Sequence, residues 1–429
     1  MDCSLNFARR EADSFGVQMV GLAGLAGFLG AMLLGHAWSL SGNRLLLLFL
    51  FATAAPMVLL SLLILQVYRR TSTELQFQSP AFHWPRVWVK YVGLLLTFLF
   101  LAMAYRFFPQ YMKDFYHPFW GFMEIAMGPF LLAALPYIAW VDARMKSPED
   151  GYWHMGLVAL GRWREVDWKE VKSHALGWLV KGFFLPFMIG AAMVHLEPLV
   201  QEGLDWTSFD QFYVTGLNLI LAVDVVFGCI GYLLTLRVLD SHIRTTESTL
   251  LGWLVALSCY PPFATFLWKS FLSYKAEIQW QGCFDNAPIL YISWGFLILI
   301  LHGVYSWSTC CFGYRFSNLT NRGIIVDGPY RYLKHPAYVC KNLAWWLMFV
   351  PFITHVGWWD AVRASVCQAL TNGIYALRAW TEERHLKSDP AYVAYSQWMA
   401  EHSLWAHVKR WCHPAIRRTP WNLPLQEKT

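Results

Sequence analysis

Long apolar runs alternate with short polar segments along almost the whole chain. The runs are about twenty residues long, which is the length that an α-helix needs to cross the apolar core of a bilayer. Backbone groups inside lipid must bond within their own segment, so we expect the runs to be helical. The pattern predicts ten transmembrane helices, at residues 16–40, 43–67, 87–107, 118–141, 174–196, 211–236, 248–270, 287–313, 337–355 and 357–379.

The amino-acid composition agrees with a membrane protein and excludes a water-soluble fold. Apolar residues make up 56% of the chain and charged residues only 14%. A soluble domain carries about 25% charged residues, so this chain has too few charges to cover a surface that faces water. A β-barrel would show short alternating segments instead of long apolar runs. We therefore expect an all-α, multi-pass integral membrane protein.

The basic residues are distributed unevenly over the loops between the predicted helices. If the N-terminus faces the cytoplasm, the loops on that side and the C-terminal tail contain most of the Lys and Arg residues. Two loops on the opposite side, residues 197–210 and 356–360, contain none. This distribution fits ten helices with both termini in the cytoplasm. The net charge of +6 is spread over many loops rather than gathered in one stripe, so we expect no nucleic-acid partner.

The sequence pattern divides the chain into three parts. Residues 1–285 are predicted to form an N-terminal transmembrane bundle whose role the sequence does not show. Residues 286–400 contain the polar motifs described below. Residues 401–429 are expected to form a cytoplasmic tail at the membrane interface, because tryptophan and basic residues are mixed there.

The first of two polar segments near the C-terminus lies where a cytoplasmic loop is expected to enter the membrane. It covers residues 322–342 and reads RGIIVDGPYRYLKHPAYVCKN. Its Gly-Pro pair at 328–329 predicts a tight turn. Pro336 suits the first turn of a helix, which places Tyr338 on that turn. Polar side chains are thus expected to gather at the membrane surface.

The second polar segment lies where the last predicted helix leaves the membrane. It covers residues 378–395 and reads RAWTEERHLKSDPAYVAY. Arg378 and Glu382 are four residues apart and share a helix face. Glu383 is rotated from that face by about 100°. The two adjacent carboxylates are therefore expected on different helix faces.

Together the two segments resemble the isoprenylcysteine carboxyl methyltransferases and the related phospholipid methyltransferases. The family pattern is G-x-Y-x-x-x-R-H-P-x-Y, then a hydrophobic helical hairpin, then R-x-x-x-E-E and a tyrosine-rich exit. The corresponding positions here are Gly328, Tyr330, Lys334, His335, Pro336, Tyr338, Arg378, Glu382, Glu383, Tyr392 and Tyr395. The resemblance covers roughly residues 290–400, with matching order and spacing. The chain departs from the pattern at three points. Lys334 replaces an arginine, Cys340 replaces a smaller residue, and the connection after Glu383 is two residues shorter.

The resemblance implies an enzyme that transfers a methyl group from S-adenosylmethionine to an acceptor in the membrane. It implies a cofactor site lined by Arg322, Ile325, Tyr330, His335, Pro336, Tyr338 and Glu382. It also implies that Arg378 faces the methyl-accepting group, as both the catalytic and a substrate-binding residue. The acceptor would be a lipidic or prenylated molecule with a carboxylate, a thiol or a polar head group, reached from the membrane lipids at an active site on the cytoplasmic side.

The chemistry of these residue types agrees with that implication. Methyl transfer from a sulfonium depends mainly on holding donor and acceptor in line with water excluded. The aromatic faces of Tyr330 and Tyr338 attract a sulfonium cation, and Glu382 can hold a cationic group of the cofactor. Arg378 offers a planar pair of donors for a carboxylate or phosphate. Asp224 lies in the middle of a predicted helix, so we expect it to line a polar cavity for the substrate.

Each of these features also has an ordinary interpretation. Arg378 and Glu382 alone would suit an exposed ion pair on a helix surface. The tyrosines alone would suit an aromatic belt at the membrane interface. Two other classes of protein stay open, a membrane sterol-type reductase that binds NADPH and a ten-helix transporter. The nine cysteines form no CxxC pair, so no metal site is expected. The sequence leaves the oligomeric state open.

Overall fold

The computed structural model describes residues 3–78, 80–273, 279–284, 286–353 and 357–412, with residues 3–15 described by their backbone alone. Within these ranges the predicted all-α fold is confirmed, apart from one antiparallel pairing of β1 (Thr245–Thr246) with β2 (Thr320–Asn321). The helices are α1 (Cys3–Ala37), α2 (Gly42–Leu59), α3 (Trp84–Phe107), α4 (His117–Asp142), α5 (Gly151–Ala159), α6 (Trp168–Gln201), α7 (Phe209–Leu233), α8 (Leu250–Leu257), α9 (Phe263–Ser270), α10 (Trp280–Cys283), α11 (Pro288–Phe312), α12 (Pro336–Phe349), α13 (Trp358–Leu386), α14 (Pro390–His402) and α15 (Leu404–Cys412).

Seven helical segments in the described part of the chain are long and apolar enough to cross a membrane. Each coincides with one of the ten predicted helices, which supports a multi-pass membrane protein. The apolar pattern located them because the bilayer thickness sets the length of an apolar helix. They are Gly16–Ala37, Gly42–Ile64, Trp84–Phe107, Asp114–Asp142, Trp168–Gln201, Phe209–Leu233 and Pro288–Arg315.

The other three predicted helices differ from the expectation. Residues 248–270 form two short helices, α8 and α9, because Pro261 and Pro262 between them cannot continue a helix. α12 has 14 residues. At 1.5 Å per residue it is about 21 Å long, shorter than the roughly 30 Å apolar core of a bilayer. α13 has 29 residues but contains too many polar positions to qualify. Ten continuous apolar helices are therefore not observed in the described residues.

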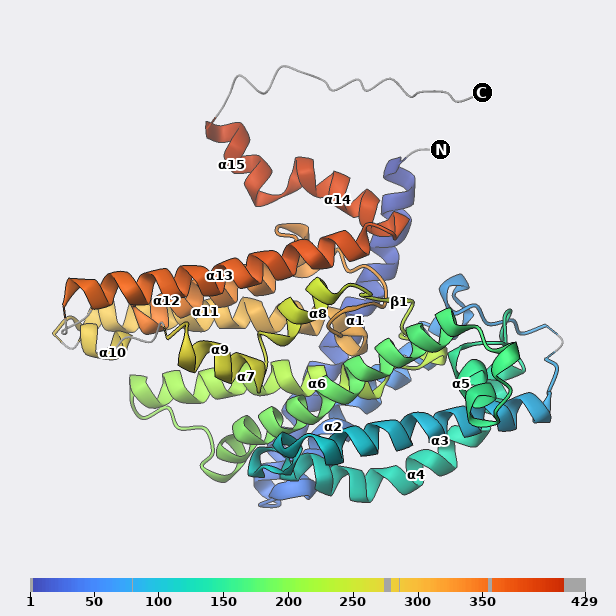
Figure 1. Ribbon diagram of the computed structural model, residues 1–429. Helices are drawn as coiled ribbons and strands as arrows, with labels where there is room; N and C mark the ends of the chain where they lie inside the picture. The colour runs from blue at the N-terminus through green and yellow to red at the C-terminus, as the bar shows by residue number, and fades with distance from the viewer. Residues whose placement is uncertain (1–2, 79, 274–278, 285, 354–356, 413–429) are drawn as a thin grey trace.

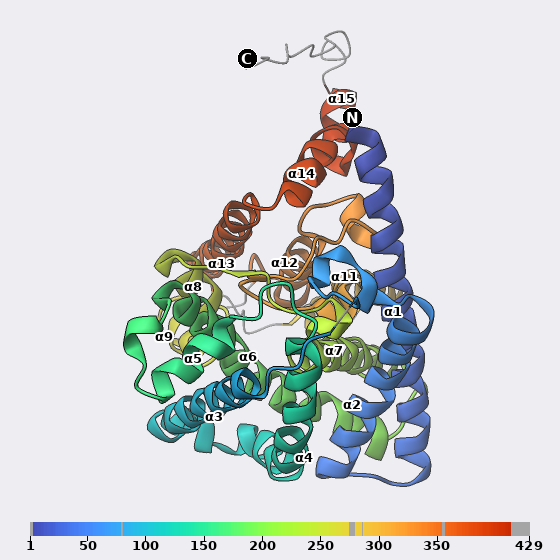
Figure 2. The ribbon, with the colours of Figure 1, turned by 90° about the vertical axis from the view of Figure 1, so that its right-hand side faces the viewer.

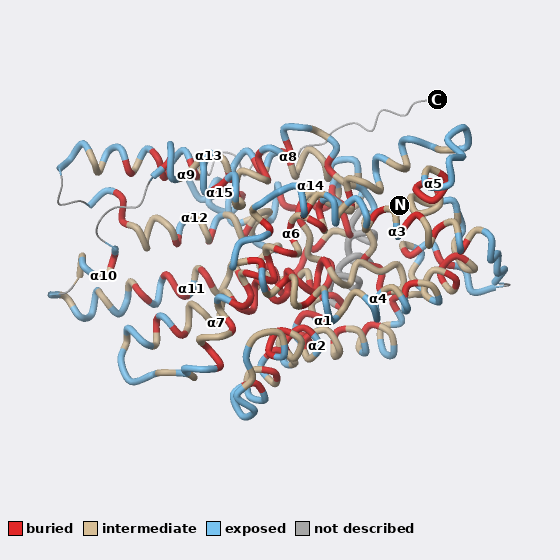
Figure 3. Tube along the Cα trace, turned by 60° about the horizontal axis from the view of Figure 1, so that its bottom comes forward, coloured by how far each residue is buried: buried red, intermediate tan, exposed pale blue. Residues whose placement is uncertain are grey.

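Four helices run side by side around the candidate motifs. α7, α11, α12 and α13 lie nearly parallel in Figures 1 and 3, whereas α1 crosses α11 steeply (Figures 1 and 2). The crossing is close because Gly21 has no side chain. A Cβ atom there would lie 2.2 Å from the carbonyl oxygen of Cys310. Small residues at a crossing let two helix backbones approach, so Gly21 permits α1 to pack on α11.

The main apolar core lies where α1, α2, α6 and α7 meet, and Figure 3 shows burial concentrated in this central region. Phe28, Phe49, Phe184 and Phe227 are fully buried there. α11 contacts both α1 and α7, and α12 packs on α11 in turn. The helices that carry the C-terminal motifs are thus attached to the N-terminal bundle through α11.

A buried group of charges joins α3, α4 and the start of α5. The Lys90 Nζ atom lies 2.9 Å from Asp142 Oδ1 and 3.4 Å from Asp150 Oδ1. Arg86 donates from Nε and Nη2 to the same Asp142 carboxylate, at 2.9 and 2.8 Å. Lys90 and Asp142 are each only 2% exposed. Buried charges are stable when they are paired and hydrogen-bonded, so Asp142 fixes the adjoining ends of α3 and α4.

Replacing Asp142 by alanine should destabilise the protein strongly. Breaking a buried ion pair from one side costs about 3–5 kcal/mol, because the remaining charge stays buried. We expect Asp142→Ala to lower the thermal unfolding temperature of the purified protein, measured by circular dichroism in detergent. Glu165→Ala is the control, since Glu165 forms an exposed pair with Arg162, and it should leave the unfolding temperature unchanged. Equal losses in both variants would contradict a structural role for Asp142.

Candidate functional site

The two polar segments meet where α12 begins and α13 ends. The Tyr338 hydroxyl, on the first turn of α12, donates a hydrogen bond of 2.8 Å to Glu382 Oε2. His335 Nε2 lies 3.1 Å from Glu383 Oε1, and Lys334 Nζ lies 3.4 Å from Glu383 Oε2. The α12–α13 hairpin therefore brings residues of both sequence segments into direct contact.

The loop before α12 has the shape that its glycine and proline require. Gly328 has φ = +62°, and a Cβ there would lie 2.6 Å from Cys311 Sγ. A larger residue would be strained in this left-handed conformation and would also displace the cysteine. Pro336 is buried on the first turn of α12, where a missing N–H has no cost. The turn at Gly328 thus leads into Tyr330, and Pro336 starts the helix that presents Tyr338.

Glu382 and Glu383 contact different partners, since they lie on different faces of α13. The hydrogen bond with His335 lowers the pKa of Glu383 from 4.5 to about 2, and the charge of Lys334 contributes. Glu383 is therefore ionised at neutral pH and ties the loop to α13. The His335 ring also stacks on the Tyr338 ring, with centroids 5.5 Å apart and planes 2° from parallel. His335 is thus held between Glu383 and Tyr338.

Arg378 is buried, with 7% of its surface exposed. Its Nη2 donates to Asn318 Oδ1 at 2.5 Å. Its guanidinium carbon lies 5.5 Å from the ring centre of Tyr260 and 5.2 Å from that of Tyr338. Among the described residues no carboxylate lies within ion-pair distance of Arg378. Helix spacing alone also permitted an exposed ion pair between Arg378 and Glu382. That pair is not observed in the described part of the chain, and Glu382 is hydrogen-bonded to Tyr338 instead.

α14 covers the loop that carries Tyr330. The Tyr395 hydroxyl donates to the backbone oxygen of Tyr330 at 2.7 Å, and Lys334 Nζ donates to Ser396 Oγ at 2.9 Å. Tyr392 is buried beside Tyr395. The short connection after Glu383 therefore still brings the tyrosine-rich exit against the first segment.

Arg322 and Ile325 lie in the packing beneath this loop. Arg322 is 3% exposed, and its guanidinium donates to three backbone carbonyl oxygens at 2.6–2.8 Å, those of Ser241, Gly231 and Phe316. Ile325 is buried and packs against residues of α1 and α11. Both side chains are committed to contacts within the chain, so they hold the loop in place.

The N-terminal bundle contributes Asp224 from α7 to the same region. Asp224 is 7% exposed and accepts hydrogen bonds from Tyr305 and Thr309 of α11, both at 2.5 Å. Lys341 of α12 is among the charged groups that act on it electrostatically. Asp224 thus belongs to a buried polar cluster between α7 and α11. Its expected role in a substrate cavity stays a prediction.

Lys341 is the most prominent residue that sequence reasoning missed. Its Nζ lies 5.2 Å from the ring centres of Tyr305 and Trp345 and 5.8 Å from that of Tyr375. Lys341 follows Tyr338 by three residues, so helix spacing could have placed both on one face. Tyr305, Tyr375, Tyr260 and Asn318 had no such signal, because they join the cluster only through tertiary packing.

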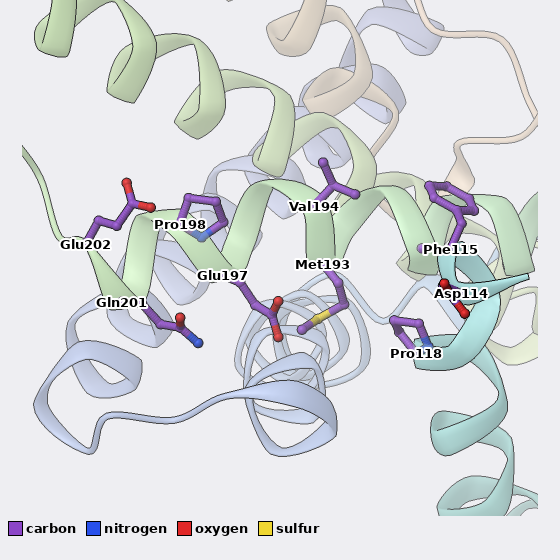
Figure 4. Close-up of a pocket in the computed structure, with 10 residues that line it drawn as sticks. Asp114, Phe115, Pro118, Met193, Val194, Glu197, Pro198, Gln201 and Glu202 are labelled. Atoms are coloured by element: carbon purple, nitrogen blue, oxygen red, sulfur yellow. The ribbon is translucent and has the colours of Figure 1, made fainter.

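A separate pocket lies between the start of α4 and the C-terminal part of α6 (Figure 4). Its volume is about 380 Å³, and its lining includes the carboxylates of Asp114, Glu197 and Glu202. None of the predicted site residues lines it. In the described part of the chain, no three His, Cys, Asp or Glu side chains are grouped as metal ligands would be. The pocket therefore adds nothing to the predicted chemistry.

Removing the charge of Glu383 should weaken the loop contact in a pH-dependent way. Because its folded-state pKa of about 2 lies below the ordinary 4.5, ionised Glu383 stabilises the folded state fully above about pH 4.5 and progressively less toward pH 2. We expect Glu383→Gln to cost roughly 1–2 kcal/mol at pH 7, as for one charged and partly exposed hydrogen bond, and less at pH 3. Thermal unfolding at both pH values measures this, with exposed Glu401→Gln as control. An equal loss at both values would mean that Glu383 acts through packing.

The cluster contains a buried cation, Arg378, a half-buried cation, Lys341, and two carboxylates among apolar helices. Arg378 and Lys341 lie against aromatic rings, while Asp224 and Glu382 accept hydrogen bonds from hydroxyl groups. Ionisable groups surrounded by apolar helices are functional candidates because their burial is costly.

No family model, no curated protein and no solved structure matches this chain.

Proposed function

We propose that this chain is an integral membrane methyltransferase that uses S-adenosylmethionine and methylates an amphipathic acceptor in the membrane. One observation carries the proposal: the two halves of the motif converge through Tyr338–Glu382 and through the contacts of Glu383 with His335 and Lys334. The convergence supports the proposal because a methyltransferase of the resembled kind needs both halves at one site. Separate surface positions for the two halves would have argued against it.

The cluster offers groups that suit a cationic cofactor. Within the described residues, Tyr338 is the one hydrogen-bond donor to Glu382, so the other carboxylate oxygen is available for a cationic group. The aromatic faces of Tyr330 and Tyr338 would attract the sulfonium. We assign Tyr330, His335, Pro336, Tyr338 and Glu382 to the cofactor site. Arg322 and Ile325, also expected there, would act by holding the backbone of the loop.

The chain's own residues would act by positioning and by excluding water. When S-adenosylmethionine is bound, it supplies a methyl carbon whose bond to sulfur breaks as the acceptor's lone pair forms the new bond, leaving a neutral thioether. Holding donor and acceptor in line is the main requirement of such a displacement. Arg378 lies over Tyr338, next to the proposed cofactor group, and its planar fork can orient an anionic acceptor. We therefore assign Arg378 to the acceptor.

We further propose ten passages through the membrane, with both termini and the site on the cytoplasmic side. β1 follows α7 and β2 follows α11, and the two strands pair, so these helices end on the same side. Between the strands, α8 and α9 lead away from this side and α11 returns (Figure 1). The broken pair α8–α9 would thus serve as one passage, and the α12–α13 hairpin would add two. This arrangement agrees with the distribution of Lys and Arg over the loops.

A transporter is the second candidate that a specific observation favours. Transporters bind substrates beside interrupted helices. Tyr260 lies at the interruption between α8 and α9, and its ring faces the guanidinium of Arg378. A reductase has no comparable support among these contacts. Cofactor binding separates the three classes, because only a methyltransferase requires S-adenosylmethionine and only a reductase requires NADPH.

Removing the charge of Glu382 should weaken cofactor binding. A charge-assisted hydrogen bond contributes about 1.5–3 kcal/mol, so Glu382→Gln should lower affinity for S-adenosylmethionine by roughly ten- to a hundredfold. Isothermal titration of the purified protein with S-adenosylmethionine, and separately with NADPH, measures this. Glu401→Gln, an exposed change on α14, should leave the affinity unchanged. Binding of NADPH alone would assign the site to a reductase, and binding of neither would remove both enzyme classes.

Replacing Arg378 by lysine should separate turnover from cofactor binding. Lysine keeps the charge but loses the planar fork, and a small misplacement of an in-line acceptor costs about a hundredfold in rate. We expect Arg378→Lys to bind S-adenosylmethionine nearly as wild type while methyl transfer to extracted membrane lipid falls by about that factor. Arg384→Lys is the control, since Arg384 pairs with Glu247 outside the cluster. Loss of S-adenosylmethionine binding in Arg378→Lys would contradict this assignment and would place Arg378 in the cofactor site instead.

A further inference from the structure

Lys341 is a half-buried cation without an anionic partner at contact distance. Three aromatic rings, those of Tyr305, Trp345 and Tyr375, surround its Nζ at 5.2–5.8 Å. Within the described residues its ammonium has no hydrogen-bond acceptor and no carboxylate within ion-pair distance. Asp224 and Arg378 are the charged groups that act on it from further away. An ammonium in such surroundings has donors available for a ligand.

Arg378 is in the same situation on the neighbouring helix. It makes one hydrogen bond, to the neutral Asn318, and the described residues offer no other acceptor to its remaining donors. It is nine-tenths buried, so water does not replace the missing acceptors freely. A buried guanidinium whose donors are unused is costly for the free protein. Both cations thus point to a ligand that supplies acceptors.

The two cations lie against the same pair of tyrosines. The Tyr338 and Tyr375 rings lie 5.7 Å apart, one from α12 and one from α13. Arg378 of α13 lies over Tyr338 of α12, and Lys341 of α12 lies over Tyr375 of α13. The crossed arrangement places both positive groups along one aromatic wall.

The Asp224 carboxylate is already engaged by hydroxyl groups. Both oxygens of Asp224 accept hydrogen bonds, from Thr309 and from Tyr305. Tyr305 is also one of the three rings around Lys341. Asp224 therefore holds the Tyr305 ring in position, and it offsets part of the positive charge without contacting either cation.

We propose that Lys341 and Arg378 form a two-cation subsite for the anionic head group, a carboxylate or phosphate, of an amphipathic molecule held in the membrane. Its identification as the methyl acceptor rests on the proposed function, whereas the binding of an anion does not. The aromatic wall suits the apolar carbons next to such a head group. Exposed apolar side chains on the same two helices, such as Leu343 and Leu377, offer a path for its tail in lipid.

Titration with simple amphiphiles tests the subsite directly. Purified protein in a neutral maltoside detergent is titrated with dodecyl phosphate, inorganic phosphate and dodecyltrimethylammonium. We expect saturable binding of dodecyl phosphate, and a loss of about ten- to a hundredfold in Lys341→Gln, the value of one charge-assisted hydrogen bond. If Lys341→Gln does not fold, Lys341→Met keeps the apolar stem and carries the same expectation. Lys181→Gln is the matched control, because Lys181 of α6 also lies over an aromatic ring, 3.2 Å from the centre of Trp178.

The outcomes separate the subsite from the enzyme assignment. Equal dodecyl phosphate affinity in wild type and the Lys341 variant would overturn the subsite, as would tighter binding of dodecyltrimethylammonium. Inorganic phosphate binding as tightly as dodecyl phosphate would overturn the amphipathic ligand. If the wild type does not bind S-adenosylmethionine but binds dodecyl phosphate in a Lys341-dependent way, the methyltransferase assignment fails and the subsite stands. If it binds S-adenosylmethionine but the Lys341 variant binds dodecyl phosphate as tightly as wild type, the subsite fails and the methyltransferase assignment stands.

Discussion

The contact between the start of α12 and the end of α13 determines how the candidate site is assembled. Tyr338 bonds Glu382, while His335 and Lys334 hold Glu383. These contacts hold two helices in register at the end where both sequence motifs lie. Arg378 lies over Tyr338 for the same reason, since a shift of one helical turn along α13 would move it by about 5.4 Å.

The low polarity of the surroundings explains why the charges of the cluster are held by neutral groups. Taking a charge out of water costs several kcal/mol unless other groups replace its hydration. Here hydroxyl groups and an amide contact Asp224, Glu382 and Arg378, and aromatic faces contact Arg378 and Lys341. The charges are therefore tolerated without cancelling one another. That arrangement leaves a carboxylate oxygen and several cationic donors for ligands of opposite sign.

The N-terminal bundle is more than an anchor for the C-terminal helices. Asp224 of α7 contacts Tyr305 and Thr309 of α11, and α11 packs on α12. Tyr260, from the interruption between α8 and α9, lies beside Arg378. The polar cluster therefore includes residues from both the predicted N-terminal and C-terminal parts. A protein that carried only residues 286–400 would lack Asp224 and Tyr260 from this cluster.

The sequence by itself indicated a multi-pass membrane protein and located the seven helices that are long and apolar enough to cross a bilayer, because bilayer thickness sets the length of an apolar helix. It also indicated Tyr338, Glu382 and Arg378 as candidate site residues, because helix periodicity and motif order are local properties. Only the tertiary structure decided that Glu382 bonds Tyr338 rather than Arg378, and that Lys341 is enclosed by aromatic rings. Those contacts join residues far apart in the chain, and local spacing carries no information about which distant side chains will pack together.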